Sequence, residues 1–190
     1  GSVLGSKKIK AIVIKEPNEK FKREFVDRDK YEKANKKLKE IMRNSEETKR
    51  LKEVGTMFNI DFNNPVAGLP VRNFRAEFFN DADKINSEAM VKKLEERNGK
   101  GGIPCQRGCL IGCSNIYNDE EENYLTSGLE YETVAMCGSN CDISDLDYLA
   151  KIGRLCDDIG LDTIETGATI AVCMEAGKIE WGDSEAVMKL

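Results

Sequence analysis

Apolar residues recur at intervals of three and four positions over most of the chain from Asp29 onwards. This spacing predicts amphipathic helices, because about 3.6 residues per turn bring such positions onto one face. Lysines and glutamates lie between them and are typical of a solvated helix face with ion pairs. The predicted helices span residues 29–43, 46–57, 87–97, 129–136, 145–159 and 163–176. The expected fold class is mainly α, an orthogonal, irregular helical bundle with a short N-terminal strand segment.

Local start and stop signals support several of these helices. Ser45 is a predicted N-cap, and three four-residue segments resemble the capping box, with a small polar residue followed three positions later by an acidic one. These segments are S-G-L-E at 127–130, S-D-L-D at 144–147 and D-T-I-E at 162–165. Gly160 is placed to end the helix before it. Residues 59–79, which contain N-N-P and G-L-P, are predicted to form a loop.

The two ends of the chain indicate a segment of a larger protein. Lys8–Lys15, K-I-K-A-I-V-I-K, is a β-branched run that predicts one strand, and a strand needs partners. We therefore expect residues 1–16 to be the end of a preceding β-rich domain. Residues 17–190 are expected to form a helical domain that is truncated at its C-terminus, because Asp183–Leu190 begins a helix and ends on apolar residues.

Composition limits the classes of function. A net charge of −5 over 190 residues gives no general reason to expect nucleic acid or an anionic membrane as partner. Seven cysteines, an odd number, fit thiolate ligands in a reducing compartment, the cytoplasm, better than a secreted disulfide framework. The absence of histidine excludes imidazole zinc sites, a Cys–His nucleophile pair and the usual general base. Chemistry in this chain must use sulfur and carboxylates.

The stretch 104–115, P-C-Q-R-G-C-L-I-G-C-S-N, has the most distinctive chemistry. Cys105, Cys109 and Cys113 recur every four residues, with glycines and a proline among them. An iron–sulfur cluster needs several thiolates that converge from a short irregular loop, and glycine allows such a loop. The same spacing could place the cysteines on one buried helix face, but the proline and glycines lower helix propensity there. A metal or cluster loop is the favoured interpretation.

Two acidic residues occupy an unfavourable position. Asp157 and Asp158 lie in the last turn of the predicted 145–159 helix, where the helix dipole disfavours negative charge by a few tenths to about 1 kcal/mol. Taken alone, this placement favours simple solvation. The alternative is that one carboxylate meets a ligand with several hydrogen-bond donors.

Several segments together resemble the aldehyde:ferredoxin oxidoreductases, which carry tungsten or molybdenum on two pterins beside one [4Fe–4S] cluster. They are C-L-I-G-C-S-N, S-G-L-E-Y-E-T, G-S-N-C-D-I-S-D-L-D and L-C-D-D-I-G-L-D-T-I-E-T-G with M-E-A-G. L-G-S-K-K-I-K-A-I-V-I resembles the last strand of the family's N-terminal β domain, and L-P-V-R-N-F also fits. The resemblance runs nearly end to end and in order. It implies the middle of a longer enzyme, mainly its first helical domain, with flanking domains of the same polypeptide missing.

The resemblance implies a role for six residues. Cys105, Cys109 and Cys113 would be the first three cluster ligands, although the first gap is three residues where many members have two. The fourth ligand would lie beyond Leu190, so the 103–117 loop is expected to be loosely ordered or metal-free in the isolated chain. Asp157 and Asp162, in D-D-I-G-L-D, match the family's D-x-x-G-L-D pterin motif, and a carboxylate can accept two N–H bonds from an aminopyrimidine. Asp157 should then be exposed and free of a lysine or arginine partner.

Glu130, in L-E-Y-E-T, resembles an acidic residue near the metal that assists proton transfer. Its capping-box position offers a structural explanation, and Glu132 is a competing candidate. The remaining cysteines lie on or near apolar helix faces and are interpreted as buried structural thiols: Cys137, Cys141, Cys156 and Cys173.

The implied function is oxidation of an aldehyde or related substrate at a tungsten or molybdenum bis-pterin site, with electrons passing through a [4Fe–4S] cluster to ferredoxin. The isolated chain is expected to be inactive, and a homo-oligomer is compatible with this interpretation. Two alternatives come from other classes. One is a self-contained iron–sulfur electron-transfer module with Cys137 or Cys141 as fourth ligand. The other is a helical interaction domain with structural cysteines.

Overall fold

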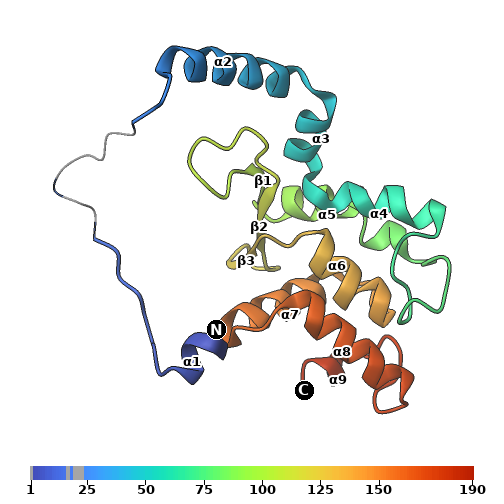
Figure 1. Cartoon of the computed structure of the whole chain (residues 1–190). Helices are drawn as coiled ribbons and strands as arrows, with labels where there is room; N and C mark the ends of the chain where they lie inside the picture. Colours follow the sequence, from blue (N-terminus) through green and yellow to red (C-terminus); the bar gives the residue numbers. More distant parts are fainter. Residues whose placement is uncertain (1, 16–17, 19–23) are drawn as a thin grey trace.

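The computed structural model describes residues 2–15, 18 and 24–190, and helices dominate it (Figure 1). The α-helices are α1 (Ser2–Ser6), α2 (Arg28–Asn44), α3 (Glu46–Val54), α4 (Phe58–Asn63), α5 (Ser87–Glu96), α6 (Tyr131–Cys137), α7 (Leu146–Ile159), α8 (Thr163–Glu175) and α9 (Ser184–Val187). The 3-10 helices are η1 (Gly55–Met57), η2 (Asn64–Val66), η3 (Ala82–Lys84) and η4 (Ser139–Cys141). The mainly α prediction is confirmed. Among the residues described, no helix has the length and apolar character needed to cross a membrane.

All six predicted helices are present, and their caps explain several boundaries. Ser45 accepts a hydrogen bond from the Thr48 N–H at 3.3 Å and opens α3. Gly160 ends α7 in the left-handed conformation, with φ of 75°. The S-D-L-D capping box was wrong: Asp145, not Ser144, caps α7 by accepting from the backbone N–H two residues later. The Ser144 hydroxyl is instead bonded to the carboxylate of Asp81 at 3.2 Å.

The predicted N-terminal strand was also wrong. Residues 2–6 form α1, and residues 8–15 have no regular structure, with Val13 and Ile14 almost fully exposed. A β-branched run forms a strand only where neighbouring strands satisfy its backbone N–H and C=O groups. Across the described part of the chain, no strand pairs with this segment, which runs away from α1 in Figure 1. The predicted domain boundary at residues 16–17 lies outside the described residues.

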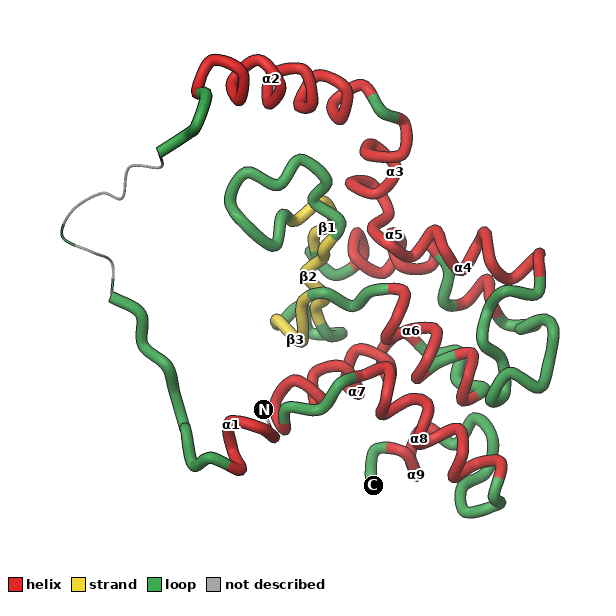
Figure 2. The backbone as a smooth tube through the Cα atoms, viewed as in Figure 1, coloured by secondary structure: helices red, strands yellow, loops and turns green. Residues whose placement is uncertain are grey.

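A three-stranded antiparallel sheet, which the sequence analysis did not predict, lies in the middle of the chain (Figure 2). Its strands, in the order β1-β2-β3, are β1 (Lys100–Ile103), β2 (Ser114–Asn118) and β3 (Tyr124–Ser127). Ile116 of β2 pairs with Lys100 on one side and Ser127 on the other. Helices α3 and α5 pack against β1, and α7 packs against β3. The predicted 59–79 loop was wrong over its first residues, which belong to α4 and η2.

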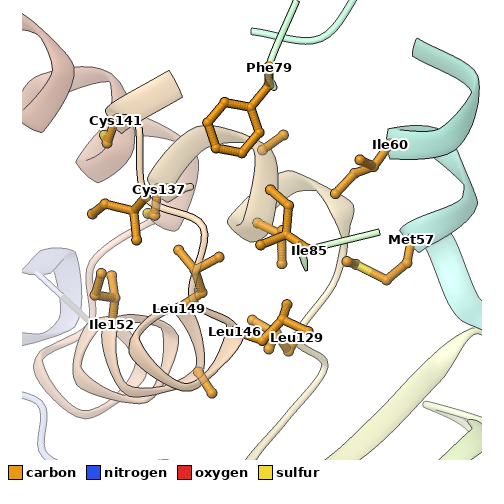
Figure 3. Close-up of a cluster of buried hydrophobic side chains, with 14 of the residues drawn as sticks. Met57, Ile60, Phe79, Ile85, Leu129, Cys137, Cys141, Leu146, Leu149 and Ile152 are labelled. Atoms are coloured by element: carbon orange, nitrogen blue, oxygen red, sulfur yellow. The ribbon is translucent and has the colours of Figure 1, made fainter. Parts of the chain in front are cut away.

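One hydrophobic core joins the two halves of the chain (Figure 3). Met57, Ile60 and Ile85 contribute from the N-terminal half, and Leu146 and Leu149 of α7 contribute from the C-terminal half. Each of these side chains is at most 2% exposed. This core holds the sheet and the C-terminal helices together, and so fixes the surface on which the candidate site lies.

Helices α6 and α8 pack closely because Gly167 faces the α6 backbone. A Cβ atom at position 167 would lie 2.4 Å from the Met136 carbonyl oxygen and 2.9 Å from the Cys137 nitrogen. Backbone atoms cannot move aside as a flexible side chain can. Gly167→Ala is therefore expected to lower the free energy of unfolding by about 1–3 kcal/mol, measured by urea denaturation.

Gly153→Ala, within α7, is the matched control. Its added Cβ would meet only the Thr133 Cγ2 atom at 3.6 Å, an ordinary contact. Replacing a helical glycine by alanine without a clash should be neutral or stabilise by about 0.5–1 kcal/mol. Equal losses in the two variants would contradict the close approach of α6 and α8.

Candidate functional site

A polar pocket of about 260 Å³ opens where the end of β3 meets α7 and α8. Hydroxyl groups and two carboxylates dominate its wall, together with two glycines that leave backbone accessible. The lining residues are Thr126, Ser127, Gly128, Leu129, Thr133, Gly153, Asp157, Leu161, Asp162 and Thr163. Such a wall offers mainly hydrogen-bond acceptors and suits a polar ligand with N–H donors.

Both predicted cofactor-binding residues lie in this one pocket. Asp157 is in the last turn of α7, Asp162 is the N-cap of α8, and the left-handed turn at Gly160 brings them together. The Asp157 side chain is exposed, and among the described residues it forms no ion pair. The nearby cation Arg154 is bonded to Asp158 at 2.9 Å instead. The expected exposure of Asp157 is therefore observed.

Asp162 has a structural role of its own. Its Oδ1 accepts a hydrogen bond from the Glu165 N–H at 2.9 Å, as the D-T-I-E capping box predicted. Thr163, the next residue, is hydrogen-bonded through its hydroxyl to that of Thr133 at 2.9 Å, which ties α8 to α6 at the pocket wall. Asp162 therefore holds the pocket's shape, whereas Asp157 presents a free carboxylate to it.

Glu130 lies beside this pocket, as the N-cap residue of α6. Its side chain makes no cap hydrogen bond, so the capping-box explanation was wrong. The hydroxyl of Ser127, the first residue of the predicted capping box, donates instead to the Tyr124 hydroxyl at 3.1 Å. Glu130 is half-buried, and burial, followed by the charge of Glu132, raises its pKa. Glu132 itself is exposed. Of the two candidate carboxylates, Glu130 and Glu132, only Glu130 is half-buried, and this burial raises its pKa.

The three loop cysteines lie between β1 and β2, on residues 104–113. Cys105 is exposed, and Cys109 and Cys113 are partly buried. Burial raises the pKa of the Cys113 thiol, and the nearby charge of Glu130 raises it further. Within the part of the chain described, no three cysteine or carboxylate side chains converge closely enough to hold a metal ion. The three cysteines therefore lie on one loop without forming a preorganised cage.

Backbone atoms pack closely at the base of this loop and leave space around its tip. A Cβ at Gly112, where φ is +61°, would lie 2.8 Å from the Gly102 carbonyl oxygen, and a Cβ at Gly55 would lie 2.8 Å from that of Cys113. At the tip, a Cβ at Gly108 would meet no atom within 4 Å. Glycine is thus required at the base because the two arms of the loop approach closely.

The other cysteines belong mainly to the core. Cys137 and Cys141 are buried, and their thiols donate to the carbonyl oxygens of Thr163 and Gly167. Burial raises the pKa of both thiols, that of Cys141 to about 12. A cluster ligand must be a thiolate, so this environment argues against either residue as a fourth ligand. Cys156 is likewise buried, whereas Cys173 is only partly so.

Sequence reasoning missed several residues at the site. Thr133 and Gly153 line the pocket, and Asn115 binds the Gly128–Leu129 turn beside it. Each acts through a partner far away in the sequence, so no local pattern identifies it. The only local signal at Asn115 is its position two residues after Cys113 in the C-S-N segment.

Comparison with known proteins identifies the family of the chain. A family model described as aldehyde ferredoxin oxidoreductase, domains 2 and 3, matches residues 33–190. Tungsten-containing aldehyde ferredoxin oxidoreductases of Thermococcus kodakarensis and Pyrococcus furiosus are 33% and 31% identical to the chain, each over 98% of it and 32% of their own length. A protein of Pyrococcus furiosus named aliphatic sulfonate oxidoreductase, WOR-like subunit, is 25% identical over the whole chain and 31% of its own length.

The chain thus spans about a third of the length of the curated relatives it matches. The family match covers most of the sequence and includes the cysteine loop, Glu130 and both pocket aspartates. The chain therefore belongs to the aldehyde ferredoxin oxidoreductase family and corresponds to the region of its domains 2 and 3.

Proposed function

We propose that this chain is part of a cytoplasmic enzyme that oxidises aldehydes and delivers the electrons to ferredoxin. In this proposal it binds one pterin of a tungsten or molybdenum cofactor and provides three ligands of a [4Fe–4S] cluster. The observation that carries the proposal is that Asp157 and Asp162 line one polar pocket. Glu130 follows the pocket-lining Leu129, and its charge helps to raise the pKa of the Cys113 thiol. Since the chain spans a third of its relatives, the activity belongs to the complete polypeptide.

The pocket suits a pterin by its donor and acceptor chemistry. A pterin edge presents N–H groups, and the carboxylate of Asp157 can accept two of them without first breaking an ion pair. Thr133 and Thr163 add hydroxyl groups. Gly128 and Gly153 contribute no side chain, so a flat ligand can approach the backbone at both positions.

The cysteine loop suits a cluster by its ligands. Cys105, Cys109 and Cys113 are thiols on a glycine-containing loop, and a Cβ at Gly108, at the tip of this loop, would meet no atom within 4 Å. Cluster binding requires their deprotonation, and a cubane cluster would need a fourth ligand besides these three thiolates.

Oxidation of an aldehyde with water gives a carboxylic acid, two protons and two electrons. The metal–pterin group supplies the two-electron redox centre when bound. Glu130 is placed to take up a proton, because its carboxylate is half-buried beside the pocket and its raised pKa makes it a better base than an exposed glutamate. Cys105, Cys109 and Cys113 would hold the cluster, which would supply the one-electron redox chemistry needed to reduce ferredoxin.

Asp157→Asn in the complete polypeptide tests the proposal. Loss of a charged acceptor should weaken pterin binding about 10- to 100-fold, because hydrogen bonds to charged groups contribute about 1.5–3 kcal/mol. The measurements are tungsten, molybdenum and pterin content, together with aldehyde-dependent reduction of ferredoxin. Folding stability should stay equal or rise slightly, because a negative charge leaves the C-terminal end of α7.

Asp158→Asn is the matched control, since Asp158 lies in the same helical turn but pairs with Arg154 and does not line the pocket. It should retain wild-type cofactor content. Equal cofactor loss in both variants, or a wild-type polypeptide without cofactor or aldehyde oxidation, would contradict the proposal.

Anaerobic reconstitution of the isolated chain with iron and sulfide separates this proposal from the self-contained module. Only three ligands are available on the loop, and Cys137 and Cys141 are buried thiols. We therefore expect little stable incorporation. One cubane cluster per chain, by iron counting and visible absorption, would favour the module.

A further inference from the structure

Asn115, the second residue of β2, is held by three hydrogen bonds to a single turn. Its side chain is only 5% exposed. Its Nδ2 donates to the Leu129 carbonyl oxygen at 2.8 Å, and its Oδ1 accepts from the Leu129 N–H at 3.1 Å. The Gly128 N–H donates to the Asn115 carbonyl oxygen at 3.0 Å. One buried amide therefore fixes the turn that connects β3 to α6.

This contact joins the three parts of the candidate site. Asn115 follows Cys113 by two residues, so it lies at the base of the cysteine loop. On the other side, Gly128 and Leu129 line the polar pocket, and Glu130 comes next in the chain. A Cβ at Gly128, where φ is +69°, would lie 3.5 Å from the Ser114 Oγ and 4.0 Å from a Glu130 carboxylate oxygen. The loop base, the pocket wall and Glu130 thus meet at this turn.

We propose that Asn115 is a positioning residue, which sets Glu130 and the Gly128 wall of the pocket relative to the cysteine loop. It touches neither the substrate nor the cofactor and acts through the backbone of Leu129. The inference rests on the proposed function, because it assigns a catalytic consequence to a contact beside the site. Small displacements matter there, since a misplacement of about 1 Å can lower a rate about 100-fold.

The side chain must be asparagine for a simple chemical reason. Leu129 presents one donor and one acceptor to it, and a primary amide of this length supplies the complementary pair. Aspartate would keep the acceptor and lose the donor. Alanine would lose both and leave a buried N–H and C=O without partners.

The chain contains a matched control for the loss of such a contact. Asn64 makes the same pair of bonds to another turn: its Nδ2 donates to the Phe79 carbonyl oxygen at 3.1 Å, and its Oδ1 accepts from the Phe79 N–H at 2.9 Å. Asn64 lies outside the pocket and the cysteine loop. Asn64→Ala therefore reports the structural cost of losing a two-bond amide contact, without affecting the site.

Hydrogen exchange in the 190-residue chain tests the contact itself. Asn115→Ala should raise the exchange rate of the Leu129 amide by about tenfold or more, whereas Asn64→Ala should do so for Phe79 and leave Leu129 protected. Asn115→Asp should give an intermediate rate at Leu129. Unchanged protection of Leu129 in Asn115→Ala would overturn the inference.

Steady-state kinetics of the complete, cofactor-loaded polypeptide tests the consequence. We expect Asn115→Ala to lower kcat about 10- to 100-fold, with KM and metal content within about twofold of wild type, and to shift the electron paramagnetic resonance spectrum of the reduced cluster. Asn64→Ala should keep wild-type kcat and spectrum. Equal losses in both variants, or unchanged kcat in Asn115→Ala, would overturn the inference. A wild-type polypeptide without aldehyde oxidation would instead refute the proposed function, and the Leu129 exchange rate would still report on the contact.

Discussion

Glu130→Gln in the complete polypeptide is expected to lower kcat for aldehyde oxidation about 100- to 10,000-fold, the range attributed to a positioned general base. Glutamine keeps the size and the hydrogen-bonding oxygen of the side chain but cannot take up a proton. Binding of the substrate should change little, so the loss should appear in kcat rather than in KM. The measurement is aldehyde-dependent ferredoxin reduction, with metal content determined for each preparation.

Folding stability provides an independent check on this variant. Burial raises the pKa of Glu130, so the neutral carboxyl is favoured in the folded state. The contribution of Glu130 to stability is therefore greatest at acidic pH and is lost as pH rises through its folded-state pKa. At neutral pH, Glu130→Gln should be as stable as wild type or more stable, while its activity is low. A general destabilisation would indicate a structural role instead.

Glu132→Gln supplies the control for position. Glu132 lies in the first turn of the same helix but is exposed to solvent. Its replacement should leave kcat within about twofold of wild type. If Glu132→Gln were the damaging change and Glu130→Gln were harmless, the assignment of the proton-accepting carboxylate would be reversed.

The helices could be predicted because their signals are local. The N-caps Ser45 and Asp162 and the left-handed Gly160 act within one helical turn, and the structure uses all three as predicted. The S-G-L-E and S-D-L-D segments carry the same local signal and failed. Tertiary partners compete for their hydroxyls: Ser127 is bonded to Tyr124, and Ser144 to Asp81.

Strands depend on partners that a local pattern does not show. Lys8–Lys15 has strong β propensity but no neighbouring strand among the described residues, so it stays irregular. The observed strands have four or five residues each, too few for alternation to be recognised. Their pairing holds the base of the cysteine loop.

In the candidate site, too, local sequence signals could be recognised and long-range contacts could not. Asp157 and Asp162 are candidates from the sequence because they share one short motif, and the turn at Gly160 brings both to the same pocket. Asn115 and Leu129 are 14 residues apart, and Thr133 and Thr163 are 30 apart. Such contacts are fixed by the packing of α6 against α8 and the sheet, and only the folded structure reveals them.

The largest stability effect is expected at Asp147, in the first turn of α7. Its carboxylate accepts hydrogen bonds from Arg97, from the Lys93 Nζ at 2.8 Å and from the hydroxyl of the buried Tyr117 at 2.8 Å. The side chains of Asp147 and Arg97 are only 17% and 11% exposed. This carboxylate therefore connects α5, β2 and α7 in the interior.

Asp147→Asn should lower the free energy of unfolding by about 3 kcal/mol, near the lower end of the range for a broken buried ion pair, because Lys93 is still partly exposed. The neutral amide leaves the buried guanidinium of Arg97 with only the exposed carboxylate of Glu120, 3.8 Å away, as counter-charge. Urea denaturation measures the loss. Asp158→Asn, which breaks the exposed pair with Arg154, should cost less than about 0.5 kcal/mol.

The pH dependence of this loss identifies its cause. Burial alone would raise the pKa of Asp147, but hydrogen bonds from Arg97, Lys93 and Tyr117 outweigh it and hold the pKa well below its usual range. The carboxylate's contribution to stability is thus fully present above the unfolded-state pKa of about 3.9 and is lost as pH falls towards the folded-state pKa. The difference between wild type and Asp147→Asn should therefore be constant from pH 7 to about pH 5 and shrink below about pH 4. A difference that persists unchanged in acid would mean that packing, rather than the carboxylate's charge, connects these three elements.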